Sequence, residues 1–195
     1  MAIAKVNIIE AGAGVLRERA RDVPLHLMKS EVLKDFVRIM LAAMKDAPGV
    51  GLAAPQLGVS LRIIVFRDTE ENARYLTSKE RDDRVRAAIG PEVWINPLLK
   101  PLSEKKVNFL EGCLSVPGVQ AMVERFEEVE LRGLDEDGRQ KEPLRLTGWP
   151  ARIVQHEIDH LNGILYVDRM DSKTLVTQGH LAWQETEDLK ALLGV

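Results

Sequence analysis

Apolar residues recur at helical spacing in one long segment, residues 30–46. Its apolar positions, three or four residues apart and therefore on one helix face, are Leu33, Phe36, Val37, Met40 and Met44. Ser30 precedes this stripe as a candidate N-cap, and Pro48-Gly49 follows it as a stop signal. The pattern therefore predicts an amphipathic helix over about residues 30–46.

Shorter apolar segments have the character of β-strands. Residues 61–66 (LRIIVF) are typical of a buried strand. Residues 93–99 predict another strand, which Pro97 would confine to a sheet edge because proline lacks a backbone N–H. Further strand candidates are 107–110, 123–134 and 139–147, the last two flanking a turn-like Asp135-Glu136-Asp137-Gly138.

A second helix is predicted to begin at Gly148-Trp149-Pro150, since proline suits a first helical turn, and to end at Asn162-Gly163. Strands and helices are segregated along the chain rather than strictly alternating. We therefore expect an α+β fold with antiparallel or mixed sheets packed around this helix.

The remaining segments carry weaker patterns. Residues 1–29 read as irregular, and 49–56 as a closely packed loop or short strand. The charge-dense residues 67–90 read as a surface excursion, and the 172–195 tail has a weakly helical end. The length favours one domain over 1–195.

Composition narrows the class of protein. The chain has 195 residues, a net charge of −3 and one cysteine. This charge excludes a strongly basic DNA-binding protein, and no apolar stretch approaches the roughly 20 residues of a membrane span. The N-terminal residues do not have the pattern of a secretory signal, nor the Arg- and Ser-rich, acid-poor composition of an organellar transit peptide. We expect a bacterial cytoplasmic protein, or an organellar one if a transit peptide was removed.

The second helix contains His156-Glu157-Ile158-Asp159-His160, an H-E-x-x-H motif. Residues four apart on a helix lie about 40° apart around its axis, so both imidazoles can reach one ion. Glu157 points near that ion without binding it, as a general base should. The motif therefore predicts a catalytic metal site.

A third protein ligand is needed, because catalytic sites of this kind use three and leave one position open. The only thiol, Cys113, is one candidate, and Cys/His₂ is a common zinc set. Acidic residues after the motif are the alternatives, as in a zinc endopeptidase: Asp168, Asp171, Glu185 and Glu187. A structural metal site is a third hypothesis, although Glu157 argues against it.

Three segments together resemble the signature motifs of peptide deformylases. They are GVGLAAPQ at 49–56, EGCLS at 111–115 and QHEIDHL at 155–161. The similarity runs over about residues 10–171. Residues 67–90 and GWPARIVQHE at 148–157 resemble the longer-loop subgroup that includes eukaryotic organellar enzymes. The tail, 172–195, carries no motif.

The resemblance implies hydrolysis of the formyl group from N-formylmethionine of new polypeptides, with ribosome association plausible. It implies a metal held by Cys113, His156 and His160, natively Fe(II), which Ni, Co or Zn can replace. Glu157 would be the general acid and base. Gln56 and the backbone N–H of Leu114 would hydrogen-bond the formyl oxygen.

The resemblance also places substrate contacts. Gly49, Val50 and Gly51 would lie along an extended peptide, while Val50, Leu114 and Ile153 are candidate walls of the methionine pocket. Glu111 and Gly112 would lie beside them. Asp159 either orients a neighbouring group or forms a surface ion pair. We expect packing roles for Trp94, Trp149 and Trp183, and we assign no role to His26 or His180.

Overall fold

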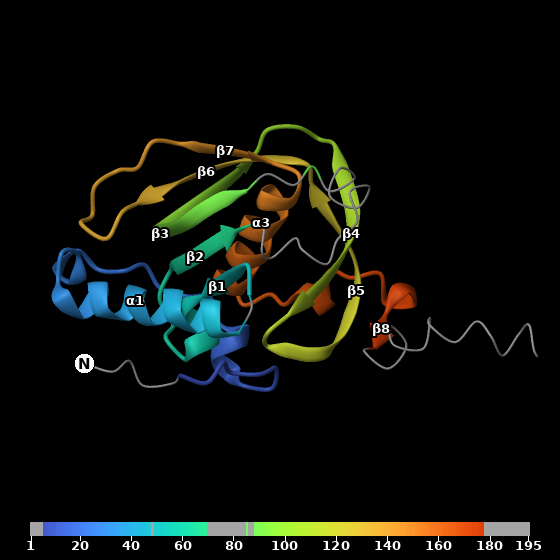
Figure 1. The fold of residues 1–195 in the computed structure, drawn as a ribbon, viewed down its shortest axis with the longest axis horizontal. Coiled ribbons are helices and arrows are strands. Elements are labelled where there is room, and N and C mark those ends of the chain that lie inside the picture. Colours follow the sequence, from blue (N-terminus) through green and yellow to red (C-terminus); the bar gives the residue numbers. More distant parts are fainter. Residues whose placement is uncertain (1–5, 48, 70–84, 86–87, 178–195) are drawn as a thin grey trace, which may run out of the picture.

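The computed structural model describes residues 6–47, 49–69, 85 and 88–177. Strand β2 (Ile63–Asp68) shows how the layers of the fold are arranged. Ile63 and Val65 pack with residues of helix α1 (Glu31–Asp46), whereas Ile64 and Phe66 pack with residues of helix α3 (Trp149–Leu161). Since alternate residues of a strand face opposite sides, this sheet has a helix on each face (Figure 1).

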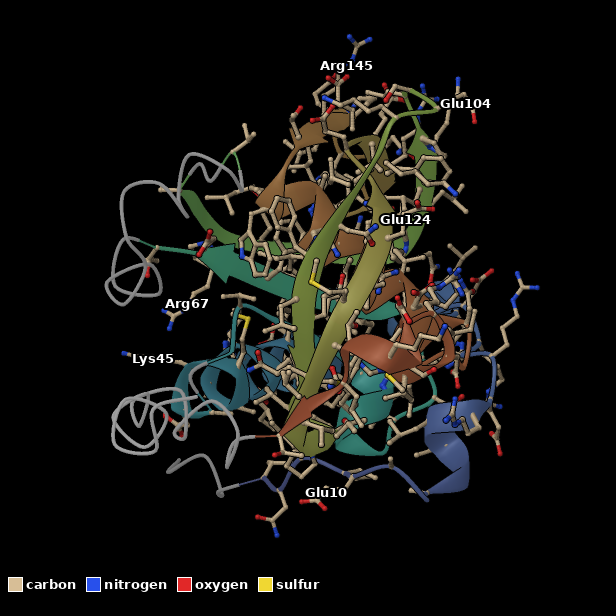
Figure 2. All side chains as sticks on the ribbon, turned by 90° about the vertical axis from the view of Figure 1, so that its right-hand side faces the viewer. Glu10, Lys45, Arg67, Glu104, Glu124 and Arg145 are labelled. Carbon is tan, nitrogen blue, oxygen red and sulfur yellow. The ribbon has the colours of Figure 1, made fainter. Side chains whose placement is uncertain are left out.

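The strands form two sheets whose ladders are all antiparallel. The five-stranded sheet has the order β1 (Gly51–Ala53), β2, β3 (Ile89–Pro101), β6 (Glu128–Leu134) and β7 (Leu144–Thr147). The three-stranded sheet has the order β4 (Lys106–Cys113), β5 (Val116–Phe126) and β8 (Val176–Thr177). Figure 2 shows β4 and β5 running side by side across one face of the molecule. The expected α+β class with antiparallel sheets around a central helix is confirmed.

Short 3-10 helices connect these elements. They are η1 (Gly14–Arg17), η2 (Leu25–Leu27), η3 (Ala54–Leu57), η4 (Tyr166–Asp168) and η5 (Ser172–Thr174). The predicted irregular N-terminal segment is thus confirmed over its described part, apart from two single turns. The predicted packed segment at 49–56 contains β1 and most of η3.

Both predicted helices form where the sequence placed them. The Ser30 hydroxyl accepts a hydrogen bond from the Leu33 N–H, so Ser30 caps α1 as expected. α3 begins at Trp149 and ends at Leu161, with Pro150 in its first turn. Of the 13 residues of α3, 11 are buried, so the motif-bearing helix is central to the molecule.

The prediction that Pro97 marks an edge strand is wrong. β3 lies between β2 and β6, but its pairing with β6 shifts register between Ile95 and Leu98. Asn96, in the left-handed region with φ of 50°, lies in this interruption. A bulge removes the need for a ladder hydrogen bond from Pro97.

The single strand predicted over 123–134 is also wrong. β5 ends at Phe126 and β6 begins at Glu128, so the chain passes from one sheet to the other at Glu127. The hairpin after β6 is confirmed, because the Asp135 N–H bonds the carbonyl of Arg139 across the turn. Most of the 67–90 excursion lies outside the described residues. The end of the tail, about residues 181–193, for which the sequence predicts weak helix, lies outside them as well. In the described part of the chain, no helix combines the length and apolarity that a bilayer crossing requires.

Candidate metal centre and active site

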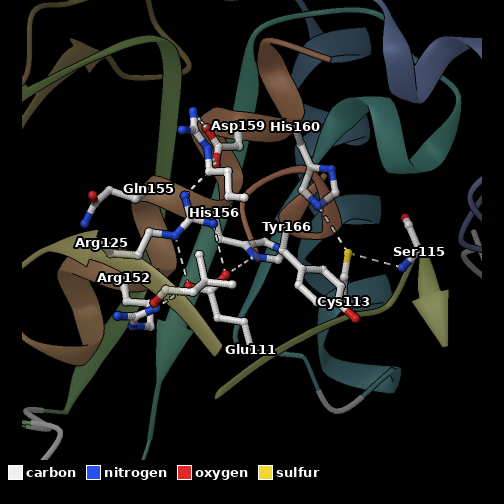
Figure 3. Close-up of polar contacts among 12 residues, drawn as sticks. Glu111, Cys113, Ser115, Arg125, Arg152, Gln155, His156, Asp159, His160 and Tyr166 are labelled. Atoms are coloured by element: carbon white, nitrogen blue, oxygen red, sulfur yellow. Dashed lines mark hydrogen bonds and ion pairs between the residues drawn. The ribbon is translucent and has the colours of Figure 1, made fainter. Parts of the chain in front are cut away.

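Cys113 and the two motif histidines come together from different elements. Cys113 ends β4 and pairs with Val116 across the turn to β5, while His156 and His160 lie one turn apart on α3. One ligand atom from each of the three residues lies within 4.8 Å of the others. Cys113 Sγ is 3.2 Å from His160 Nε2 (Figure 3).

This donor set fits a divalent ion. A tetrahedral ion with ordinary metal–sulfur and metal–nitrogen bonds separates its ligand atoms by about 3.5 Å, close to the spacing of Sγ and Nε2. A thiol and two imidazoles are also the soft and intermediate ligands that zinc, iron, cobalt and nickel accept. The three residues are therefore suited to bind one ion, as the sequence predicted.

Glu111 orients one of the imidazoles. Its Oε2 accepts a hydrogen bond from His156 Nδ1 at 3.0 Å, which leaves the other ring nitrogen for an ion. The carboxylate is buried, yet the hydrogen bonds from His156 and Arg125 outweigh burial and hold its pKa below the ordinary value. Glu111 therefore stays ionised and keeps His156 in one tautomer.

Arg125 connects the strand that carries the thiol with the helix that carries the imidazoles. It donates through Nε and Nη2 to Glu111 at 2.9 and 3.0 Å, and through Nη1 to Asp159. Asp159 also accepts two hydrogen bonds from Arg169. Asp159 is 5% exposed, so of its two sequence-based interpretations the structure supports orientation of an arginine rather than a surface ion pair.

Glu157 occupies a pocket beside the metal-binding group and against β1. It is 4% exposed, and its Oε2 has no hydrogen-bond partner among the described residues. Burial raises the pKa of Glu157 to about 7. A carboxyl group with this pKa can both accept and return a proton near neutral pH.

Gln56 points its amide nitrogen toward the thiol. Its Oε1 accepts a hydrogen bond from the Ala53 N–H at 2.9 Å. This fixes the side chain so that Nε2 lies 3.7 Å from Cys113 Sγ and 3.2 Å from Ser115 Oγ. A buried amide N–H₂ is thereby directed at the same place as the metal-binding group.

A cavity of about 430 Å³ opens beside these groups. Every residue that the sequence assigned to the substrate lines it: Gly49, Val50, Gly51, Glu111, Gly112 and Ile153. Leu114, Gln56 and Glu157 line it too. At Gly49 a Cβ would lie 3.0 Å from a methyl group of Leu114, so the glycine lets the two segments approach closely.

Among the described residues, the acidic candidates for the third metal ligand have other contacts. Asp168 bonds Arg17 and the Leu165 N–H instead of facing the thiol. Asp171 caps η5, and Glu185 and Glu187 lie outside the described residues. Trp94 is a core residue as predicted.

Sequence reasoning missed three buried polar residues around the site. Arg125 and Arg152 both donate to Glu111, and Tyr166 packs on His156. Arg125 and Arg152 lie outside the quoted motif segments. Arg125 gives no signal in the sequence, because residues 123–134 contain several other charged residues. The only signal of Arg152 is a positive charge in the predicted second helix, four residues before His156.

Comparison with known proteins agrees with this site. Residues 5–175 match the family described as polypeptide deformylase. Peptide deformylase 1A, chloroplastic, from Solanum lycopersicum is 46% identical over 90% of this chain and 63% of its own length. Peptide deformylase 1 from Streptomyces coelicolor is 41% identical over 94% of this chain and 83% of its own. The chain thus spans less than two thirds of the tomato protein but most of the bacterial one.

Solved structures agree as well. The Met-Ala-Ser-bound crystal structure of class I type b peptide deformylase from Acinetobacter baumannii matches with a TM-score of 0.76 and 33% identity, over 86% of this chain and 99% of that one. The actinonin complex of a peptide deformylase from Synechococcus elongatus matches with a TM-score of 0.72 and 37% identity, over 89% and 84% of the two chains. By the family match over residues 5–175 and by these relatives, the chain belongs to the polypeptide deformylase family.

Proposed function

We propose that this protein is a metal-dependent hydrolase that removes the formyl group from N-formylmethionine of new polypeptides. The reaction adds water across the formyl amide bond and yields formate and a free α-amine. The observation that carries the proposal is the convergence of Cys113, His156 and His160 within 4.8 Å beside a buried Glu157. Family membership supports the same reaction.

Cys113, His156 and His160 would hold one divalent ion. We propose Fe(II) as the native metal, by resemblance to the family, with Ni, Co or Zn able to replace it. When bound, the ion acts as a Lewis acid toward water and the formyl carbonyl. Glu111 serves this site by fixing the His156 ring.

Glu157 is the proposed general base and acid. It takes a proton from the attacking water and passes it to the departing amine nitrogen as the C–N bond breaks. Its pKa of about 7 suits both transfers. Burial against Gly51 keeps the carboxyl group at the cavity wall rather than in bulk water.

Gln56 and Leu114 are the proposed donors to the formyl oxygen. The Gln56 amide is held by Ala53 with its N–H₂ group toward the thiol, and the Leu114 N–H follows Cys113 in the chain. A donor that faces developing negative charge contributes about 3 kcal/mol of transition-state stabilisation. Both groups line the same cavity.

The substrate would lie in the 430 Å³ cavity. Val50, Leu114 and Ile153 supply apolar walls for the methionine side chain, while Gly49, Gly51 and Gly112 leave room for the peptide backbone. An extended peptide can take main-chain hydrogen bonds from a segment of this kind. The Acinetobacter relative was solved with Met-Ala-Ser bound, which supports a peptide as the ligand.

The partner is therefore a nascent N-formylmethionyl peptide, met at or near the ribosome surface. Relatives include chloroplastic and bacterial proteins. We propose the bacterial cytoplasm as the site of action, with an organelle as the alternative.

Formate release from formyl-Met-Ala-Ser tests the function. Metal-loaded protein should release formate, and Glu157→Gln should release it at least 100-fold more slowly while retaining the metal. Casein serves as the second substrate, because a zinc endopeptidase would cleave its internal bonds. Cleavage of casein without formate release would contradict the proposal.

A further inference from the structure

Tyr166 lies directly behind one of the metal-binding imidazoles. It follows α3 in the short helix η4 and is 1% exposed. Its ring stacks on that of His156, with centroids 6.2 Å apart and planes inclined by 22°. Figure 3 shows Tyr166 between His156 and Cys113.

The hydroxyl group of Tyr166 reaches a different part of the site. It donates a hydrogen bond to the backbone carbonyl of Val119 at 3.0 Å. Val119 belongs to the first half of β5, residues 116–120, and all five of these residues line the cavity. One buried side chain therefore contacts both the metal-binding helix and the opposite wall of the cavity.

Among the described residues, this wall pairs with β4 at Val116, opposite Cys113. It pairs with the two-residue strand β8 at Val119 and Gln120. Gly118 takes a left-handed conformation with φ of 80°. Pairing with β4 breaks register between Glu111 and Cys113. The Tyr166 hydroxyl adds a side-chain hydrogen bond to this wall at Val119.

We propose that Tyr166 is a positioning residue for the peptide substrate, acting through the Val119 carbonyl to hold residues 116–120 at the cavity. The inference rests on the proposed function, since the cavity is taken to bind the peptide. The ring and the hydroxyl have separable roles. The ring stacks on His156 and packs in a cluster with Ala121 and Val123 that Val116 also contacts, whereas the hydroxyl donates its hydrogen bond to Val119.

Tyr166→Phe separates the two roles, because phenylalanine keeps the ring and loses the hydroxyl. One hydrogen bond changes binding by about 2- to 10-fold. We expect the KM for formyl-Met-Ala-Ser to rise by about that factor, with kcat within about 2-fold and metal content unchanged. Thr174→Val is the matched control, because the Thr174 hydroxyl oxygen accepts from the Met122 N–H farther along β5 and outside the cavity lining.

Two further measurements keep the outcomes distinct. Amide hydrogen exchange in residues 118–120 should accelerate in Tyr166→Phe and not in Thr174→Val, and the Kd for Met-Ala-Ser should rise with the KM. Unchanged exchange and unchanged KM in Tyr166→Phe would overturn the proposal, as would a fall in kcat with metal loss. If wild-type protein releases no formate, the proposed function fails instead, and the exchange measurement still tests the link between Tyr166 and the wall.

Discussion

Gly51 lies so close to the Glu157 side chain that no larger residue fits at position 51. A Cβ built on Gly51 would lie 2.2 Å from Glu157 Oε1 and 2.7 Å from its carboxyl carbon. A Cβ atom does not make non-bonded contacts this short, so the glycine is what allows the carboxyl group to lie at the cavity. The G-x-G segment therefore makes room for the proposed general base, in addition to its proposed contact with the peptide.

Gly51→Ala should displace Glu157 and reduce kcat by at least 10-fold, because misplacing a proton-transfer group by about 1 Å costs this much or more. Metal content should stay unchanged, since no metal-binding residue is touched. Gly90→Ala is the control, because a Cβ there would meet no atom of the described residues within 4 Å. Wild-type kcat in Gly51→Ala would show that Glu157 need not occupy this position.

Arg125→Lys should weaken metal retention. Lysine keeps the charge but cannot bridge Glu111 and Asp159 as the guanidinium does, so the strand and the helix lose their shared anchor. Loss of an outer partner of a metal ligand typically lowers metal affinity by about 10- to 100-fold. The rate of metal release to a chelator measures this loss of metal retention, and circular dichroism checks that the variant is folded.

Arg132→Lys is the control for Arg125→Lys. Arg132 also pairs with a glutamate, but its side chain is 57% exposed and its partner is Glu130, away from the site. It should release metal at the wild-type rate. Equal release rates in folded Arg125→Lys and wild type would show that the buried bridge does not hold the ligands in place.

The contribution of Glu157 to the stability of metal-free protein should fall as pH rises through the range between 4.5 and about 7. Burial raises the pKa of Glu157 from 4.5 to about 7 in the folded state, so within this range the folded protein binds a proton that the unfolded chain has lost. The loss amounts to up to about 3 kcal/mol. Urea denaturation of metal-free wild type and Glu157→Gln on both sides of the range measures it.

Glu157→Gln should lack this part of the pH dependence and be the more stable of the two above pH 7, because the neutral amide carries no charge into the buried site. Parallel stability profiles for the two proteins would mean that Glu157 titrates in the folded state as it does in water.

The iron form should lose activity in air, whereas the nickel form should keep it. Ferrous iron and a bound thiolate both oxidise, and Cys113 provides that thiolate. Activity at intervals after exposure to air, with metal content measured in parallel, compares the two forms. Equal decay of both would point away from the iron–thiolate pair as the sensitive element.

Local sequence patterns predicted the elements that carry the site. The stripe of α1, the proline start of α3 and the H-E-x-x-H spacing depend on residues within a few turns of each other, and all three predictions held. The motif segments also indicated Cys113 as a ligand, and the structure brings it to the histidines.

Features set by distant contacts escaped prediction. Pro97 reads as an edge residue until the bulge at Asn96 relieves the need for its N–H. Arg125 and Arg152 read as ordinary charged residues, because their partner Glu111 lies 14 and 41 positions away. Tyr166 likewise contacts Val119, 47 positions away, and no spacing rule joins such pairs.

X-ray absorption at the metal edge of the loaded protein reports whether one thiol and two imidazoles bind a single ion. We expect one sulfur ligand at about 2.3 Å and two nitrogen ligands at about 2.0 to 2.1 Å, with the sulfur signal absent in Cys113→Ser. A wild-type spectrum without sulfur, or one that Cys113→Ser leaves unchanged, would contradict it.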